Sequence, residues 1–329
     1  MTLLTVSLAL AGYGDPVAGI PSHDERLLHL WTNAARVAPE EFEEDYNNGY
    51  EPCSFEDFSN DEQTPKPPLY IDLDLTEVAR VHSIDMKTNG CFQHESCDGT
   101  DTFERIAAYY DDTSFVGENI AMGSTNMRYS VMGMWMCSTD GHRANIMSGD
   151  WNELGAGVDA EYQTQDFGAG QLELGEPPVR MAVDDGETFY ADWGDDDAPR
   201  SLELVLEEES FDFALEYGAE EQGIYVVEVA DVDEEPCRGW SVAWETASGE
   251  SGRFPADGRW LVGTDCEGSD DGEDYLPGAG PGLFDDVGDE ELEEAMLEDL
   301  ALTGCAVSPG PTSGIAGLIG GLFVLRRRR

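Results

Sequence analysis

The sequence predicts an α+β protein in which a helix-rich part precedes an all-strand part. Between about residues 22 and 138, apolar side chains recur at helical spacing, as Leu27, Leu30, Trp31 and Ala34 do. From about residue 177 the pattern changes to short alternating runs separated by Gly, Pro and acidic turns. An apolar content of 40% is enough for a folded core, so the composition excludes a largely disordered chain.

The first part should contain four helices, followed by a strand-like segment at 153–168. Asp74 and Asp101 are the expected N-caps of the second and third helices, because each is followed three residues later by a Glu. Pro39 should stop the first helix, and 43–68 is expected to be a polar loop. The expected helices cover residues 22–37, 74–90, 101–110 and 128–138.

The second part is predicted to be a small antiparallel β-sandwich, because its short runs alternate between apolar and polar residues. Trp240, Val242 and Trp244 fall on one face, which indicates core packing rather than ligand recognition. The runs are SLELVLEE, FDFALEYG, GIYVVEVADV, GWSVAWE and GRWLVGTD.

Acidic residues outnumber basic ones by 70 to 17, which gives a net charge of −53. Proteins that bind nucleic acid neutralise phosphates with Lys and Arg, so this balance excludes a nucleic-acid partner. We interpret the acidic side chains as a solvated surface suited to salty water, where screening relieves their mutual repulsion. Calcium binding is the alternative, although the sequence has no D-x-[DN]-x-[DN]-G loop.

The cysteines indicate disulfides formed in an oxidising compartment, since no CxxC pair suggests zinc. Cys237–Cys266 is the bridge expected in the second part. The four cysteines of the first part allow three pairings, between which the sequence does not choose. The seven cysteines are Cys53, Cys91, Cys97, Cys137, Cys237, Cys266 and Cys305.

Both ends of the sequence indicate export. Residues 1–20 contain an apolar run ending in Ala9-Leu10-Ala11, an A-x-A pattern typical of signal-peptide cleavage, although no basic residue precedes it. At the other end, Cys305 precedes a short Gly-rich apolar stretch and the cluster Arg326–Arg329. The stretch is marginal for a membrane span, and the positive-inside tendency would keep the Arg cluster cytoplasmic.

This tail resembles the C-terminal sorting signals of myxobacterial surface proteins. The resemblance implies that Cys305 is the processing or lipid-attachment point and that the tail is removed. An ordinary weak tail anchor is the alternative.

Several motifs of the first part occur in a characteristic order: NAAR on the first helix, FQHES, GENIAMG, MWMCSTDGHRANIM and LGAGVDAEYQTQDFG. Together they resemble the superfamily of cysteine-rich secretory proteins, antigen 5 and pathogenesis-related 1 proteins, known as the CAP or SCP domain, and its bacterial branch in particular. The resemblance covers about residues 22–170. It implies secretion and an α-β-α sandwich, in which helices flank an antiparallel sheet.

The resemblance also implies a cleft with two His and two acidic residues. By motif position these are His94, Glu118 and His142, with Ser138 in the fourth place, where many eukaryotic members have Glu. His94, Glu118 and His142 are possible ligands for zinc or another divalent metal. Hydrogen bonds that merely hold the cleft together are the structural alternative.

An enzyme is the less favoured reading of the cleft. A Ser138–His142–Glu118 triad is conceivable, but the sequence has neither a GxSxG elbow nor an HExxH helix. The other polar residues have structural interpretations. These are His82 as a core histidine, His23 and His29 at the surface, Arg143 pairing with a carboxylate or capping carbonyls, and Asn119 and Asn145 satisfying backbone groups.

The domain order is therefore an export signal, a CAP domain, a β-sandwich-like domain, an acidic stalk and an anchor. We expect an exported protein, attached to the cell surface or released after processing, that is most simply a non-enzymatic binding module for a small apolar ligand or another protein. An extracellular metal-dependent hydrolase or protease is one alternative, and a structural or adhesion protein is another. The ranges are 1–20, 22–170, 177–267, 268–303 and 304–329.

Overall fold

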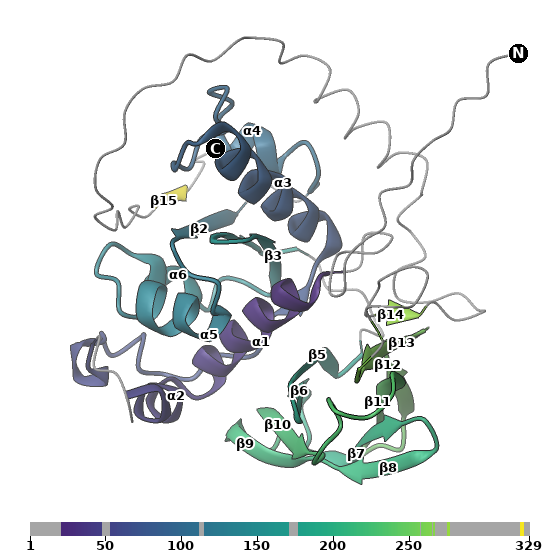
Figure 1. Cartoon of the computed structure of the whole chain (residues 1–329). Helices are drawn as coiled ribbons and strands as arrows, with labels where there is room; N and C mark the ends of the chain where they lie inside the picture. The colour runs from purple at the N-terminus through teal and green to yellow at the C-terminus, as the bar shows by residue number, and fades with distance from the viewer. Residues whose placement is uncertain are drawn as a thin grey trace, which may run out of the picture.

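A computed structural model describes two parts of the chain, a sheet flanked by helices and a pair of packed sheets (Figure 1). This mixture of helices and sheets confirms the α+β prediction. The described residues are 21–47, 53–111, 115–170, 177–256, 258–264, 266, 275–276 and 323–325. The expected export signal, Cys305 and nearly all of the stalk and anchor lie outside them.

The sheet of the first part has the strand order β1-β3-β4-β2-β15. The segment predicted as one strand is a hairpin of β3 and β4, paired from Glu153↔Gly168 to Asp159↔Tyr162. The prediction was wrong because the turn lacks Gly, Asn and Pro, and Ala160 takes the left-handed conformation at φ 55° instead. The strands are β1 (Tyr70–Ile71), β2 (Val116–Met122), β3 (Glu153–Asp159), β4 (Tyr162–Gly168) and β15 (Phe323–Leu325).

Helix α3 (Leu73–Asn89) covers one face of this sheet at unusually close range. A Cβ atom placed on Gly155 or Gly157 of β3 would lie 2.0 or 2.1 Å from a backbone carbonyl carbon of α3. The LGAG sequence of β3 therefore allows backbone-to-backbone packing. The helix begins at Asp72, whose side chain accepts a bond of 2.7 Å from Leu75 N, so the expected N-cap at Asp74 was wrong by two residues.

The other helices of the first part agree in part with their predicted positions. Helix α1 (His23–Val37) matches the prediction and starts with a capping box of Ser22 and Glu25. Pro39 does not lead into a loop but occupies the first position of α2, where its missing N–H costs nothing. The others are α2 (Pro39–Asn47), the 3₁₀ turn Phe55–Asp57, α4 (Thr102–Ile106), α5 (Met127–Tyr129), the π-helix Ser130–Met136 and α6 (His142–Ile146).

The second part is a sandwich of two sheets, as the alternating runs predict. One sheet has the order β5-β6-β10-β9 and the other β14-β13-β11-β7-β8, with β12 paired to β11. Phe189, Trp193, Trp240 and Trp260 fill the space between them. The strands are β5 (Val179–Asp185), β6 (Thr188–Gly194), β7 (Pro199–Leu206), β8 (Glu209–Asp212), β9 (Ala214–Ala219), β10 (Gln222–Glu228), β11 (Arg238–Thr246), β12 (Ser251–Phe254), β13 (Arg259–Val262) and β14 (Tyr275–Leu276).

Helix α1 joins the two parts, because the outer face of the β5-β6-β10-β9 sheet packs in the same core as α1. At this contact Asn33 Nδ2 donates to Asp192 Oδ2 at 2.6 Å. His29 is fully buried, 4.0 Å from the same carboxylate, so its expected surface position was wrong. Burial lowers the pKa of His29 to about 3, which keeps the imidazole neutral at this contact between the two parts.

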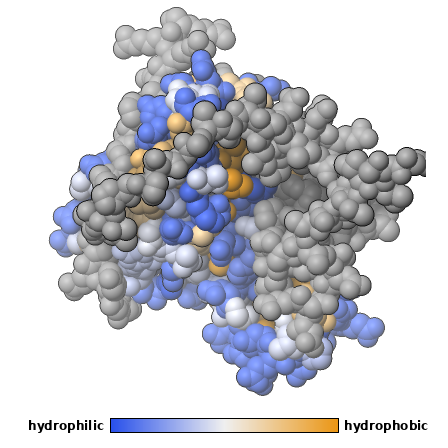
Figure 2. All heavy atoms as spheres, turned by 45° about the horizontal axis from the view of Figure 1, so that its top comes forward, coloured by the Kyte–Doolittle hydropathy of each residue, from blue (hydrophilic) through white to orange (hydrophobic). Residues whose placement is uncertain are grey.

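On the face of the molecule shown in Figure 2, most of the coloured atoms belong to hydrophilic residues. Among the large apolar side chains of the described residues, only Ile84 and Leu215 are exposed, each at 37%. Within the same residues no helix has the length and apolar character needed to cross a bilayer.

Candidate functional site

One wall of the predicted cleft is formed by His94 and Glu118. His94 lies on the loop after α3, and Glu118 lies at the centre of β2. His94 Nδ1 contacts Glu118 Oε1 at 2.7 Å, and the Arg105 guanidinium on α4 pairs with Glu118 Oε2. Glu118 is 2% exposed, so both its oxygens are bound by neighbouring side chains rather than by solvent.

The side chains around Glu118 determine the pKa of its carboxyl group. Burial alone would raise the pKa of the carboxyl group, but Arg105, His82 and His94 together outweigh it, and Arg105 contributes most of the three. The result is a pKa of about 2, below the usual 4.5. Glu118 is therefore a buried carboxylate that is already neutralised inside the protein.

The other wall carries Ser138 and His142, at the end of the π-helix and the start of α6. His142 Nδ1 contacts Ser138 Oγ at 3.0 Å, four residues apart. His142 Nε2 is buried and has no hydrogen-bond partner among the described residues. Burial, and then the nearby His94, lower the pKa of His142 to about 4, so the ring is neutral at pH 7.

Asp166 is a cleft residue that the sequence reasoning missed. It lies on β4 directly opposite Glu118 of β2 in the ladder register, and it is fully buried. Burial, and then the adjacent Glu118 carboxylate, raise the pKa of Asp166 well above its usual value. The one available signal was an acidic residue inside the buried strand YQTQDFG.

The predicted metal ligands His94, Glu118 and His142 do not converge as a set of three. Among the described residues, His94, Glu118 and His142 do not form a group whose ligand atoms all lie within 4.8 Å of one another. Ligands about 2.0–2.2 Å from one zinc ion must lie closer together than that. Glu118 is therefore not a third ligand beside both imidazoles, while metal binding by His94 and His142 alone stays a prediction.

A Ser138–His142–Glu118 triad is not assembled either. In such a triad one ring nitrogen of the His faces the hydroxyl and the other donates to the acid. His142 contacts Ser138, but Glu118 is bound by His94 and Arg105. The nucleophile therefore has no charge-stabilised base.

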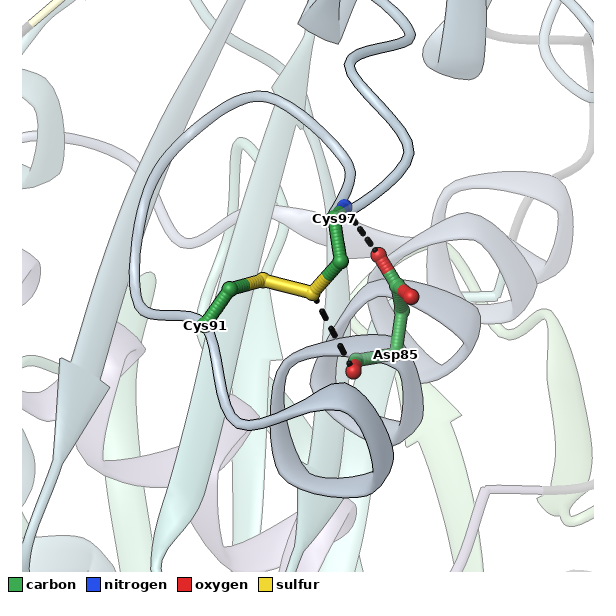
Figure 3. Close-up of side chains that lie close together, drawn as sticks. All are labelled: Asp85, Cys91 and Cys97. Atoms are coloured by element: carbon green, nitrogen blue, oxygen red, sulfur yellow. Dashed lines mark hydrogen bonds between the residues drawn. A yellow bond between two sulfur atoms is a disulfide. The ribbon is translucent and has the colours of Figure 1, made fainter. Parts of the chain in front are cut away.

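The two disulfides of the first part resolve the pairing that the sequence left open, as Cys53–Cys137 and Cys91–Cys97. In the second part Cys237–Cys266 forms as expected. Asp85 lies against the Cys91–Cys97 bridge (Figure 3). These three residues bring possible ligand atoms within 4.8 Å, but both sulfur atoms are consumed in the disulfide.

The remaining structural interpretations near the cleft are confirmed. His82 is fully buried with Nε2 3.0 Å from Gln93 O, and Trp135 Nε1 donates to Ile120 O at 3.0 Å. Three further side chains bind the backbone or a carboxylate: Arg143 to Met136 O and Glu62, Asn119 to His142 O, and Asn145 to Glu118 O.

A separate pocket with a volume of about 320 Å³ lies away from all four predicted cleft residues. It is formed by the α1–α2 corner, the segment 63–66 and the ends of β9 and β10, where the two parts of the chain meet. Its volume is at the lower end of the range of small-molecule sites. Its lining includes Val37, Ala38, Pro39, Glu40, Glu41, Pro65, Lys66 and Ala219.

The first part of the chain matches a known family. Residues 32–169 match the model of the cysteine-rich secretory protein family, CAP, which supports a CAP domain in this region. The chain is 38% identical over 96 residues to the uncharacterized membrane protein YlbC of Bacillus subtilis, and 34% identical over 90 residues to the uncharacterized protein YkwD of the same species. These matches cover 29% and 27% of this chain, and only 27% and 34% of the relatives.

Two solved structures are also similar. An extracellular SCP-domain protein from Bacillus anthracis has 34% identity and a TM-score of 0.28, covering 31% of this chain and 33% of that one. An outer surface protein from Borrelia burgdorferi has 26% identity and a TM-score of 0.27, covering 31% of this chain and 78% of that one.

Proposed function

We propose that this chain is an exported, surface-attached binding module whose CAP cleft is structural rather than catalytic. The observation that carries the proposal is the internal neutralisation of Glu118 by Arg105 and His94. Each oxygen of Glu118 is bound by a buried side chain of the protein, which favours a structural role over a catalytic one. The printed descriptions of the similar proteins, as membrane, extracellular or outer surface proteins, support the location.

The proposed ligand site is the pocket between the two parts of the chain. Its lining includes the apolar residues Val37, Ala38 and Pro65, which favours an apolar ligand. Glu40 and Glu41 on its lining disfavour an anion, and the Lys66 ammonium is already paired with Asp61 at 2.8 Å. We therefore propose a small, uncharged, apolar ligand.

Filling this pocket should abolish the binding of such a ligand. Ala219 is exposed and lines the pocket, so the indole of Ala219→Trp can enter it without disturbing the core. We expect the neutral fluorescent probe Nile red to bind the unmodified protein, and Ala219→Trp to weaken binding at least roughly ten-fold, since about 1.4 kcal/mol of apolar contact is displaced. The measurement is a fluorescence titration.

Ala108→Trp is the matched control, because Ala108 is exposed on the turn after α4 and is absent from the pocket lining. It should bind Nile red as the unmodified protein does. Equal binding by both Trp variants would overturn the pocket assignment. Turnover of a peptide or ester panel that is lost in His142→Ala would instead support the hydrolase.

A further inference from the structure

The loop that carries His94 is closed at its two ends by a disulfide. Cys91 and Cys97 are six residues apart in sequence, with His94 midway between them. Both cysteines are partly exposed, whereas His94 is only 8% exposed and faces Glu118. A reductant in solution can therefore reach the bridge, although the histidine it positions is buried.

A side chain of α3 provides a second fastening at the same end of the loop. Asp85 Oδ2 accepts a hydrogen bond of 2.7 Å from Cys97 N, and the Asp85 carbonyl oxygen lies 3.4 Å from Cys97 Sγ (Figure 3). In the middle of the loop, Thr102 Oγ1 and Arg105 Nη1 donate to His94 O at 2.6 and 2.9 Å. The loop is short and polar, so the disulfide and these hydrogen bonds together hold it in place.

The opposite wall of the cleft has its own disulfide. Cys137 follows the π-helix directly, immediately before Ser138, and bridges to Cys53 across 84 residues. The two walls are therefore fastened independently, and each bridge provides a control for the other.

We propose that the Cys91–Cys97 disulfide is a redox-sensitive clamp that holds His94 against Glu118, with Asp85 as its positioning residue. A dithiol breaks the S–S bond: its two hydrogens pass to Cys91 and Cys97 as thiols, and the dithiol closes into its own disulfide. The loop gains backbone freedom, and the His94 side chain leaves Glu118 Oε1. Glu118 then keeps Arg105 as its partner, and the His94 wall opens to solvent.

This inference extends the proposed function, since an open cleft would offer a second surface to a partner. The inference and the proposed function are tested separately, because the clamp experiment measures the accessibility of one imidazole and the pocket experiment measures the binding of a ligand. A negative pocket experiment would not contradict the clamp, and a negative clamp experiment would not contradict the pocket assignment.

The test is carbethoxylation of individual histidines by diethyl pyrocarbonate, followed by mass spectrometry of peptides. We expect the rate at His94 to rise about ten-fold or more on reduction with dithiothreitol, since reopening a short disulfide loop releases chain entropy of that order. Cys91→Ser/Cys97→Ser should show the same rise without reductant. His29, which is fully buried at the contact between the two parts, should stay unreactive and report that the protein remains folded.

The variant Cys53→Ser/Cys137→Ser is the matched control. In it, His94 should remain protected until dithiothreitol is added. Asp85→Ala should increase His94 reactivity further in the reduced protein, whereas Asp98→Asn, on the same loop but exposed, should not. Unchanged His94 reactivity in Cys91→Ser/Cys97→Ser would contradict the clamp, as would an equal rise at His29.

Discussion

Replacing Gly157 by Ala should cause one of the largest losses of stability that a single added methyl group can cause in the first part. The new Cβ would lie 2.1 Å from Ala79 C and 2.2 Å from Arg80 N, both backbone atoms of α3. A side chain can relieve such a clash by changing rotamer, but a helix backbone cannot, so α3 must move away from the sheet. We expect a loss of at least about 4 kcal/mol in the free energy of unfolding, measured by urea denaturation.

Gly149→Ala is the control for this substitution. Gly149 has no left-handed backbone, and its nearest neighbour to a new Cβ is Lys66 Cδ at 4.0 Å. Its unfolding free energy should stay within about 0.5 kcal/mol of the unmodified protein. If Gly157→Ala were as mild as Gly149→Ala, the close packing of α3 on β3 would be wrong.

Arg105→Met should produce the second large loss, because it leaves Glu118 as an uncompensated buried charge beside Asp166. Arg105 is 5% exposed and is the cation bound to Glu118. Breaking a buried pair by removing one partner costs about 3–5 kcal/mol. Urea unfolding at pH 7 is the measurement, and Arg200→Met, which breaks an exposed pair with Glu245, should cost under about 1 kcal/mol.

The loss should depend on pH in a definite direction. The folded pKa of Glu118, about 2, lies below the usual 4.5, so its pairing stabilises the protein above pH 4.5 and is lost as the pH falls towards 2. Arg105→Met should therefore cost most at pH 7 and less at pH 3. Adding Glu118→Gln should recover part of the loss at pH 7. A pH-independent loss that Glu118→Gln does not relieve would contradict the pairing.

Much of the fold could be predicted from local patterns. The helical spacing of Leu27, Leu30 and Trp31 predicted the first helix, and Asp101 was predicted as the cap of a later one, and the structure confirms both. The alternation of Trp240, Val242 and Trp244 predicted a buried strand face, and all three lie in the sandwich core. These signals depend on neighbours within a few residues, which a single sequence displays.

The wrong or missing predictions concern residues whose contacts come from distant segments of the chain. His29 looked like a surface residue because the sheet that buries it begins about 150 residues later. Asp166 went unnoticed because only the register of β2 against β4 places it opposite Glu118. In the same way, the pairing of Cys53 with Cys137 follows from the packed fold and from no sequence spacing.

The cleft positions came from the family motifs, and the structure shows what those motifs could not. His94 and Glu118 do meet, and so do Ser138 and His142, but as two separate pairs. Arg105, in the sequence FERI at 103–106, was not recognised as the partner of Glu118. The role of the cleft depends on this third residue.

Zinc titration of the purified, oxidised protein tests the central claim most directly. Isothermal titration calorimetry, compared among the unmodified protein, His94→Ala and His142→Ala, separates a cleft site from binding by the acidic surface. A structural cleft predicts the same weak heats for all three proteins, with no stoichiometric site. One equivalent of tightly bound zinc that disappears in both variants would contradict the account.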